Sequence, residues 1–85
     1  MAKVVTVVSK KGCRMCDEIT ESVLVLSARH GFEVNVVDIR DDEALHDKYW
    51  LTIPVVIVDG REVFDARDIG RNRKFIERLE PLIGD

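Results

Sequence analysis

The stretch KVVTVVSKKGCRMCDEITESVLVL, residues 3–26, decides the fold that this sequence predicts. It begins with Lys3–Val8, a short and mostly β-branched run that is typical of a buried strand. A polar turn follows over Ser9–Gly12, and from Cys16 onward apolar residues recur at helical spacing. The only two cysteines of the chain, Cys13 and Cys16, stand where the strand pattern gives way to the helical one. We therefore expect a strand, a turn and a helix, with both thiols at the start of the helix.

Three further strands and two further helices are predicted outside this stretch. Gly31 ends the first helix, in the position where a left-handed residue is favoured, and Asp59-Gly60 predicts a tight hairpin. Asp41 or Asp42 is the expected N-cap of the second helix, and Asp68 that of the last helix. The other predicted elements are the strands Glu33–Asp38, Pro54–Val58 and Glu62–Phe64 and the helix Asp41–Tyr49.

The predicted order is β-α-β-α-β-β-α, in a single domain over residues 1–85. Two strands joined by a helix favour a parallel pair with a right-handed crossover, and the hairpin adds an antiparallel edge. A chain of 85 residues buries enough surface for one modest core and no second one. The predicted fold class is therefore α/β, a four-stranded mixed sheet flanked by helices.

Composition excludes several classes of function. Hydrophobic residues make up 46% and charged residues 34% of the chain, which is typical of a globular domain. The net charge of −3 lacks the basic excess of proteins that bind phosphate backbones, so no nucleic-acid partner is expected. The apolar runs are too short to span a membrane, and the start has no leader pattern. We expect a cytoplasmic monomer, in a compartment where paired cysteines are more often catalytic or metal-binding than structural.

The two cysteines admit two non-catalytic interpretations. A zinc site needs four ligands, of which the C-x-x-C motif supplies two, and His30 and His46 lack zinc-finger spacing. A structural disulfide would close a ring of only four residues, which stabilises a fold less than a long loop does and is easily strained. A metal-holding or binding domain without turnover remains the alternative to catalysis.

A redox role fits the position of the cysteines better. Unpaired backbone N–H groups and the helix macrodipole at the start of a helix stabilise a thiolate, and they lower the pKa of a cysteine there. Lys10, Lys11 and Arg14 favour the same ionised form of Cys13, and Asp17 and Glu18 oppose it. We expect the helix terminus and Arg14 to dominate because they are nearest. Cys16 lies one turn further on, on the buried face, where it can resolve a mixed disulfide on Cys13.

Three motifs resemble the glutaredoxin-like branch of the thioredoxin superfamily: KGCRMC at 11–16, VVDIRDD at 36–42 and TIPVVIVDG at 52–60. The resemblance implies a thioredoxin-like fold and a thiol–disulfide oxidoreductase in which Cys13 attacks and Cys16 resolves. It also implies a cis Ile53–Pro54 bond beside the disulfide. The substrate would then bind along Thr52, Ile53 and Pro54, with Lys11 and Arg14 nearby, and the Ile53 backbone would pair with it as an added strand.

The sequence departs from glutathione-using members of that branch in two places. Arg14-Met15 stands between the cysteines instead of an aromatic residue, and the turn at 63–68 reads VFDARD instead of a Gly-Gly-Asp-like sequence. If glutathione binds, Lys10 or Lys11 would meet its glycyl carboxylate, and Asp65 or Asp68 its γ-glutamyl amine.

The expected partners follow from these motifs. The substrate is a disulfide-containing protein or a glutathione mixed disulfide, and no bound cofactor or metal is expected. The reductant is glutathione or a flavin-dependent reductase, and the missing turn favours the reductase. Tyr49 and Trp50, just before Thr52, are expected at a partly exposed rim near the thiols.

Overall fold

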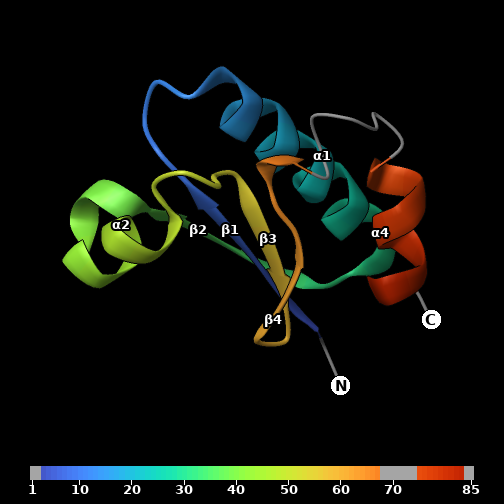
Figure 1. Ribbon diagram of the computed structural model, residues 1–85. Helices are drawn as coiled ribbons and strands as arrows, with labels where there is room; N and C mark the ends of the chain where they lie inside the picture. Colours follow the sequence, from blue (N-terminus) through green and yellow to red (C-terminus); the bar gives the residue numbers. More distant parts are fainter. Residues whose placement is uncertain (1–2, 68–74, 84–85) are drawn as a thin grey trace.

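A computed structural model describes residues 3–67 and 75–83, and its elements follow the predicted order (Figure 1). The predicted boundaries of the four strands and the first two helices hold to within one or two residues, and a 3-10 turn, η1, occupies Ile39–Asp41 before the second helix. The expected cap Asp68 lies outside the described residues. The elements are β1 (Val4–Ser9), α1 (Arg14–His30), β2 (Glu33–Asp38), α2 (Glu43–Tyr49), β3 (Val55–Val58), β4 (Arg61–Phe64) and α4 (Phe75–Ile83).

The strands form one mixed sheet in the order β2-β1-β3-β4. β1 runs parallel to β2, with Ser9 opposite Asp38, and antiparallel to β3, with Val8 opposite Val55. β3 and β4 form the antiparallel hairpin. The predicted parallel pair and the hairpin edge are thus confirmed. This register brings the ends of β1 and β2 and the start of β3 to the same edge of the sheet.

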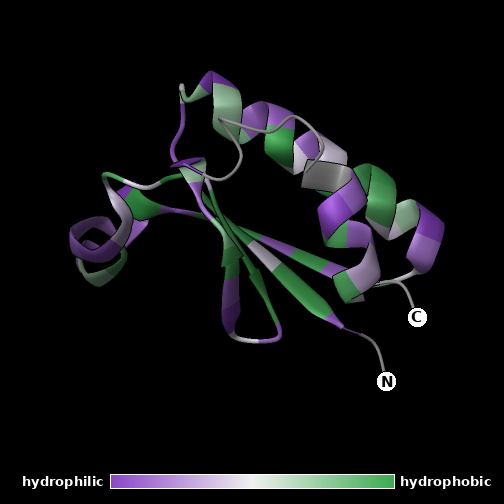
Figure 2. Ribbon diagram, turned by 45° about the vertical axis from the view of Figure 1, so that its right-hand side comes forward, coloured by the Kyte–Doolittle hydropathy of each residue, from purple (hydrophilic) through white to green (hydrophobic). Residues whose placement is uncertain are grey.

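Helices cover the two faces of the sheet unequally. α1 and α4 pack on one face, and the short α2 covers only part of the other (Figure 1). Apolar residues concentrate on the strands and on the inner faces of the helices (Figure 2). Each fully buried side chain of this kind contributes about 1.5–3 kcal/mol. The core beneath α1 and α4 contains Val5, Val7, Ile19, Val23, Leu26, Phe32, Val56, Val58, Phe64 and Leu79, and the core beneath α2 contains Val8, Ile39, Tyr49 and Val55.

Local capping signals agree with the sequence prediction. Gly31 ends α1 with φ of 75°, and its N–H donates to the Ser27 carbonyl. Asp42, rather than Asp41, is the N-cap of α2. Asp59 and Gly60 have φ of 50° and 85°, as a tight two-residue hairpin requires. Within the described ranges, no helix is long and apolar enough to cross a membrane.

Candidate active site

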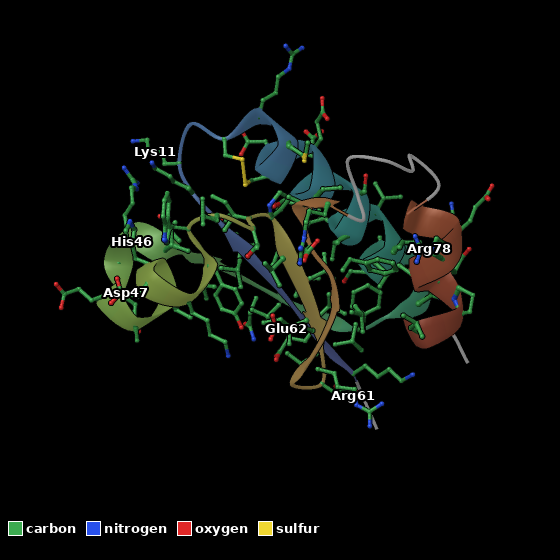
Figure 3. All side chains as sticks on the ribbon, viewed as in Figure 1. Lys11, His46, Asp47, Arg61, Glu62 and Arg78 are labelled. Carbon is green, nitrogen blue, oxygen red and sulfur yellow. A yellow bond between two sulfur atoms is a disulfide. The ribbon has the colours of Figure 1, made fainter. Side chains whose placement is uncertain are left out.

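Cys13 and Cys16 form a disulfide at the amino end of α1, with their Cα atoms 5.2 Å apart (Figure 3). Cys13 is the N-cap of α1, in an extended conformation, and its Sγ accepts a hydrogen bond from the Cys16 N–H at 3.2 Å. Cys13 is partly exposed, whereas Cys16 is fully buried. One cysteine of the pair therefore keeps surface open to solvent, and the other has none.

The loop between β1 and α1 sets this position through its backbone. The N–H of Cys13 donates to the carbonyl of Lys10 at 3.1 Å, which closes a turn just before the helix. Gly12 lies inside this turn with φ of +87°, in the left-handed region that favours glycine. The motif KKGC therefore supplies both the turn and the residue that caps the helix.

The two predicted cationic residues lie on either side of Cys13. The Lys11 side chain is exposed at the disulfide end of the molecule, and its backbone N–H donates to Asp38 Oδ2 at 3.0 Å (Figure 3). The Arg14 side chain is 95% exposed, and its Nε lies 3.9 Å from Glu18 Oε1. An ion pair this exposed contributes little to the stability of the fold. It does show that the Arg14 side chain is directed along the helix towards Glu18.

The Ile53–Pro54 bond is cis, as the resemblance implies, and Pro54 is buried immediately before β3. The N–H groups of Thr52 and Ile53 both donate to the Tyr49 carbonyl, at 2.9 and 3.1 Å, and the Thr52 carbonyl accepts from the Ala66 N–H. Ile53 can therefore offer an added strand only its carbonyl, and not its N–H as well. Its N–H already has a partner, while its carbonyl accepts no hydrogen bond from any residue within 3–67 and 75–83.

Tyr49 and Trp50 have different environments. Tyr49 is only 5% exposed and belongs to the core beneath α2, so the expectation that it lies at an exposed rim is wrong. Trp50 is 54% exposed, and its ring stacks on that of His46 with centroids 6.4 Å apart. Leu51 is 73% exposed, and Met15, between the cysteines, is 38% exposed. We call Met15, Trp50 and Leu51 the apolar rim.

Asp38 is the residue at this end that sequence reasoning missed. It terminates β2, and its carboxylate accepts hydrogen bonds from the N–H of Lys11 and from the backbone and guanidinium of Arg40. The hydrogen bonds from Arg40 lower the pKa of Asp38 to about 2. The available signal was the aspartate that ends the second strand in VVDIRDD, but its partner lies 27 residues away in the sequence.

Asp65 already has partners of its own. Its carboxylate accepts hydrogen bonds from the Arg67 backbone N–H at 2.9 Å and from Arg67 Nη2 at 3.1 Å. Asp65 was one of the two carboxylates expected to meet the amine of glutathione, and the other, Asp68, lies outside the described residues. An amine would have to compete with Arg67 for the Asp65 carboxylate.

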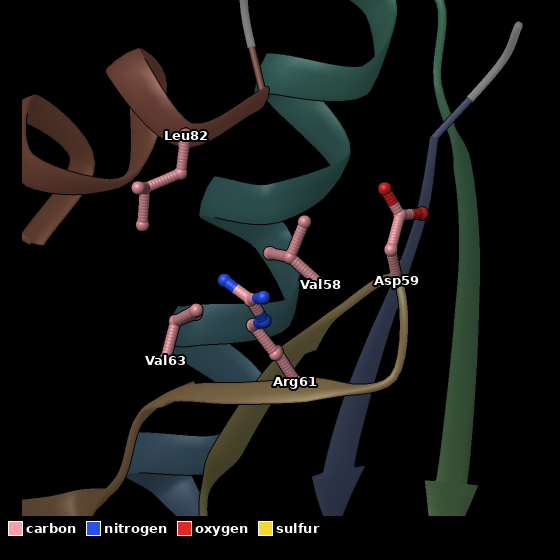
Figure 4. A pocket seen from close by; sticks show the side chains of 5 residues that line it. All are labelled: Val58, Asp59, Arg61, Val63 and Leu82. Atoms are coloured by element: carbon pink, nitrogen blue, oxygen red, sulfur yellow. The ribbon is translucent and has the colours of Figure 1, made fainter.

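Two other kinds of site could carry a function, a metal site and a pocket away from the sulfurs. Among residues 3–67 and 75–83, no group of three or more His, Cys, Asp or Glu side chains could hold a metal ion. An open pocket of about 360 Å³ lies by the β3–β4 hairpin and α4, at the edge of the sheet opposite the disulfide (Figure 4). Its lining residues are Val58, Asp59, Arg61, Val63 and Leu82.

Comparison with known proteins places this geometry in context. A family model described as "Glutaredoxin-like domain (DUF836)" matches residues 4–83. The solution structure of protein Ne2328 from Nitrosomonas europaea is similar, with a TM-score of 0.67 and 26% identity over 84% of this chain and 91% of that one. No curated protein matches this chain.

Thioredoxins are also among the similar solved structures. Thioredoxin from Fasciola hepatica has a TM-score of 0.59 and 26% identity, over 91% of this chain and 80% of its own. A mutant thioredoxin from Halobacterium salinarum has a TM-score of 0.66 over 98% of this chain and 76% of its own. At 17% identity, the second likeness shows the fold alone.

Proposed function

The chain belongs to the glutaredoxin-like domain family (DUF836), and from this premise we propose that it is a thiol–disulfide oxidoreductase acting through Cys13 and Cys16. One observation supports the proposal above all others. A partly exposed cysteine caps the first helix and is joined to a fully buried cysteine one turn further on. The likeness to thioredoxins in fold agrees with this assignment.

The proposed reaction has two exchange steps. In the reduced protein, the Cys13 thiolate attacks a substrate disulfide, so that a mixed disulfide forms and one substrate thiolate leaves. Cys16, after losing its proton, attacks the Cys13 sulfur and releases the second substrate thiolate. The substrate gains two electrons and two protons, and the protein is left with the Cys13–Cys16 disulfide. An external dithiol or two molecules of a monothiol then restore the reduced pair.

The amino end of α1 favours the first step for an electrostatic reason. Negative charge on the Cys13 sulfur is stabilised by the helix terminus and by the N–H of Cys16. A stabilised thiolate is populated more at neutral pH, so more of Cys13 is in the form that attacks the substrate disulfide. The burial of Cys16 reserves it for the second step, because a bulky substrate does not reach it directly.

We propose an extended disulfide-containing polypeptide as substrate. It would place its apolar side chains on the apolar rim and donate a backbone N–H to the Ile53 carbonyl. A flavin-dependent reductase is favoured over glutathione as the electron donor, because Asp65 is engaged by Arg67. A reducing compartment such as the cytoplasm suits this direction of electron flow.

The test compares Cys13→Ser, Cys16→Ser and the unchanged protein in reduction of a peptide disulfide. Cys13→Ser should abolish exchange, and Cys16→Ser should accumulate a mixed disulfide that is visible by mass spectrometry. Full activity in Cys13→Ser would overturn the proposal. Supplying either glutathione with its reductase or a thioredoxin-reductase-type flavoenzyme identifies the electron donor in the same assay.

A further inference from the structure

We infer that Asp38 is a positioning residue for Cys13: its carboxylate, held by Arg40, fixes the loop that presents the attacking sulfur. The inference rests on the proposed function and adds a residue to that site. It is carried by the hydrogen bonds that connect the end of β2 to the β1–α1 loop.

The connection from Asp38 to Cys13 takes two hydrogen bonds. Asp38 Oδ2 accepts from the Lys11 N–H at 3.0 Å, and the Lys10 carbonyl accepts from the Cys13 N–H at 3.1 Å. Lys11 thus links the loop to β2, and its neighbour Lys10 links the loop to the helix cap. If the first bond is lost, Lys11 and Gly12 are restrained only by the turn itself.

Arg40 holds the Asp38 carboxylate in place. The Arg40 backbone N–H donates to Oδ1 at 2.8 Å, its Nε lies 3.2 Å from both oxygens, and its Nη2 donates to Oδ2 at 3.1 Å. The Asp38 side chain is only 20% exposed. A carboxylate held by a guanidinium at both oxygens has little rotational freedom, so it presents a fixed acceptor to Lys11.

The start of the same loop is also attached to β2. Ser9 pairs with Asp38 in the sheet register, and Ser9 Oγ donates to the Val37 carbonyl at 3.2 Å. The loop therefore leaves the sheet beside Asp38 and is held again by it two residues later, at Lys11. Because the loop is attached to β2 at both places, the position of Cys13 depends on the end of β2.

The charges favour a geometric role over an electrostatic one. Asp38 faces Arg40 and the Lys11 N–H, and Arg40 also interacts with Asp41. The pairing with Arg40 lowers the pKa of Asp38 to about 2, so the carboxylate stays ionised in neutral and mildly acidic solution. Loss of Asp38 should therefore slow the reaction of the fully ionised Cys13 thiolate without raising the pH at which that thiolate forms.

The experiment compares Asp38→Ala with Asp42→Ala. Asp42 is a matched control because its carboxylate caps α2 through the N–H groups of Ala44 and Leu45 and makes no hydrogen bond to the loop. Each variant loses an aspartate cap, Asp38 that of η1 and Asp42 that of α2, and urea unfolding measures how much stability each loses. The rate of exchange with a peptide disulfide is then measured against pH for each variant.

We expect the plateau rate at high pH to fall about tenfold in Asp38→Ala and to stay unchanged in Asp42→Ala. Asp38→Asn should recover part of the rate, because an amide oxygen still accepts from Lys11. Equal plateaus in the two alanine variants would overturn the inference. So would an effect of Asp38→Ala on the pH midpoint alone, since that would indicate a purely electrostatic role.

A second measurement needs no turnover and separates this inference from the proposed function. Hydrogen exchange at the Lys11 and Cys13 amides should accelerate in Asp38→Ala and not in Asp42→Ala. If the unchanged protein reduces no disulfide, the proposed function fails, and these amides still test the restraint. Unchanged exchange at both amides would show that Asp38 does not restrain the loop.

Discussion

The backbone N–H of Cys16 donates to Sγ of Cys13 at 3.2 Å, so the buried member of the pair is placed to stabilise a thiolate on its partly exposed partner once the disulfide is reduced. The two cysteines also differ in access, because Cys16 is fully buried and Cys13 is only partly so. A C-x-x-C motif that begins a helix produces both this hydrogen bond and this difference in burial. The first cysteine becomes the cap, and the second enters the buried face one turn later.

Selective alkylation tests this asymmetry. When the reduced protein is treated with a limiting amount of iodoacetamide at neutral pH, Cys13 should be modified at least about tenfold faster than Cys16, because reactivity follows thiolate character and exposure. Peptide mapping by mass spectrometry measures both rates. Equal labelling of the two thiols would show that the asymmetry is lost once the disulfide opens.

Two leucines on α1 test which helix face stabilises the fold. Leu26 is 1% exposed in the core beneath α1 and α4, whereas Leu24, on the same helix, is 50% exposed. Leu26→Ala should cost about 2–5 kcal/mol of unfolding free energy, because it removes buried methyl groups and leaves a cavity. Leu24→Ala is the matched control and should cost well under half as much in urea titration. A comparable cost for both would contradict the assigned helix face.

Much of the fold could be predicted because its signals are local. Gly31, Asp42 and Asp59-Gly60 act on their immediate neighbours, so single residues identify the helix ends and the hairpin. The position of the cysteine pair was predictable for the same reason, since its spacing and its place at the start of the helix can be read from one segment.

The interactions that the sequence did not reveal join distant segments. The Asp38 carboxylate meets Lys11 across 27 residues, and only the parallel register of β1 and β2 brings them together. Tyr49 and Trp50 are adjacent, but the short α2 turns the first into the core and leaves the second outside. The Tyr49 carbonyl accepts a hydrogen bond from the Ile53 N–H, and no pattern of residue types indicates this contact.

An ion pair between α1 and α4 predicts the direction of a pH effect. Glu80 Oε2 lies 2.7 Å from His30 Nε2 and 3.4 Å from Arg29 Nη1. The hydrogen bond to His30, with that to Arg29, lowers the pKa of Glu80 below its ordinary value of 4.5. A carboxyl with a lowered folded pKa contributes stability that is present above the unfolded value and is lost as the pH falls through the folded one.

Glu80→Gln should therefore be less stable than the unchanged protein at neutral pH, and the difference should shrink below about pH 4.5. Glu77→Gln is the control, because Glu77 is an exposed carboxylate on the same helix. Urea titrations at several pH values measure both differences. A Glu80→Gln difference that stayed constant down to pH values near 2 would exclude this linkage.

Trp50 provides a direct test of where a substrate lies. It is the only tryptophan of the chain, it is 54% exposed, and it stands four residues before Pro54. A peptide trapped on Cys13 in the Cys16→Ser variant should cover the apolar rim, so acrylamide should quench Trp50 fluorescence less than in the peptide-free variant. A short thiol such as 2-mercaptoethanol, trapped in the same way, is the control and should leave the quenching unchanged. Identical quenching with both adducts would place the polypeptide elsewhere and remove the apolar rim from the binding surface.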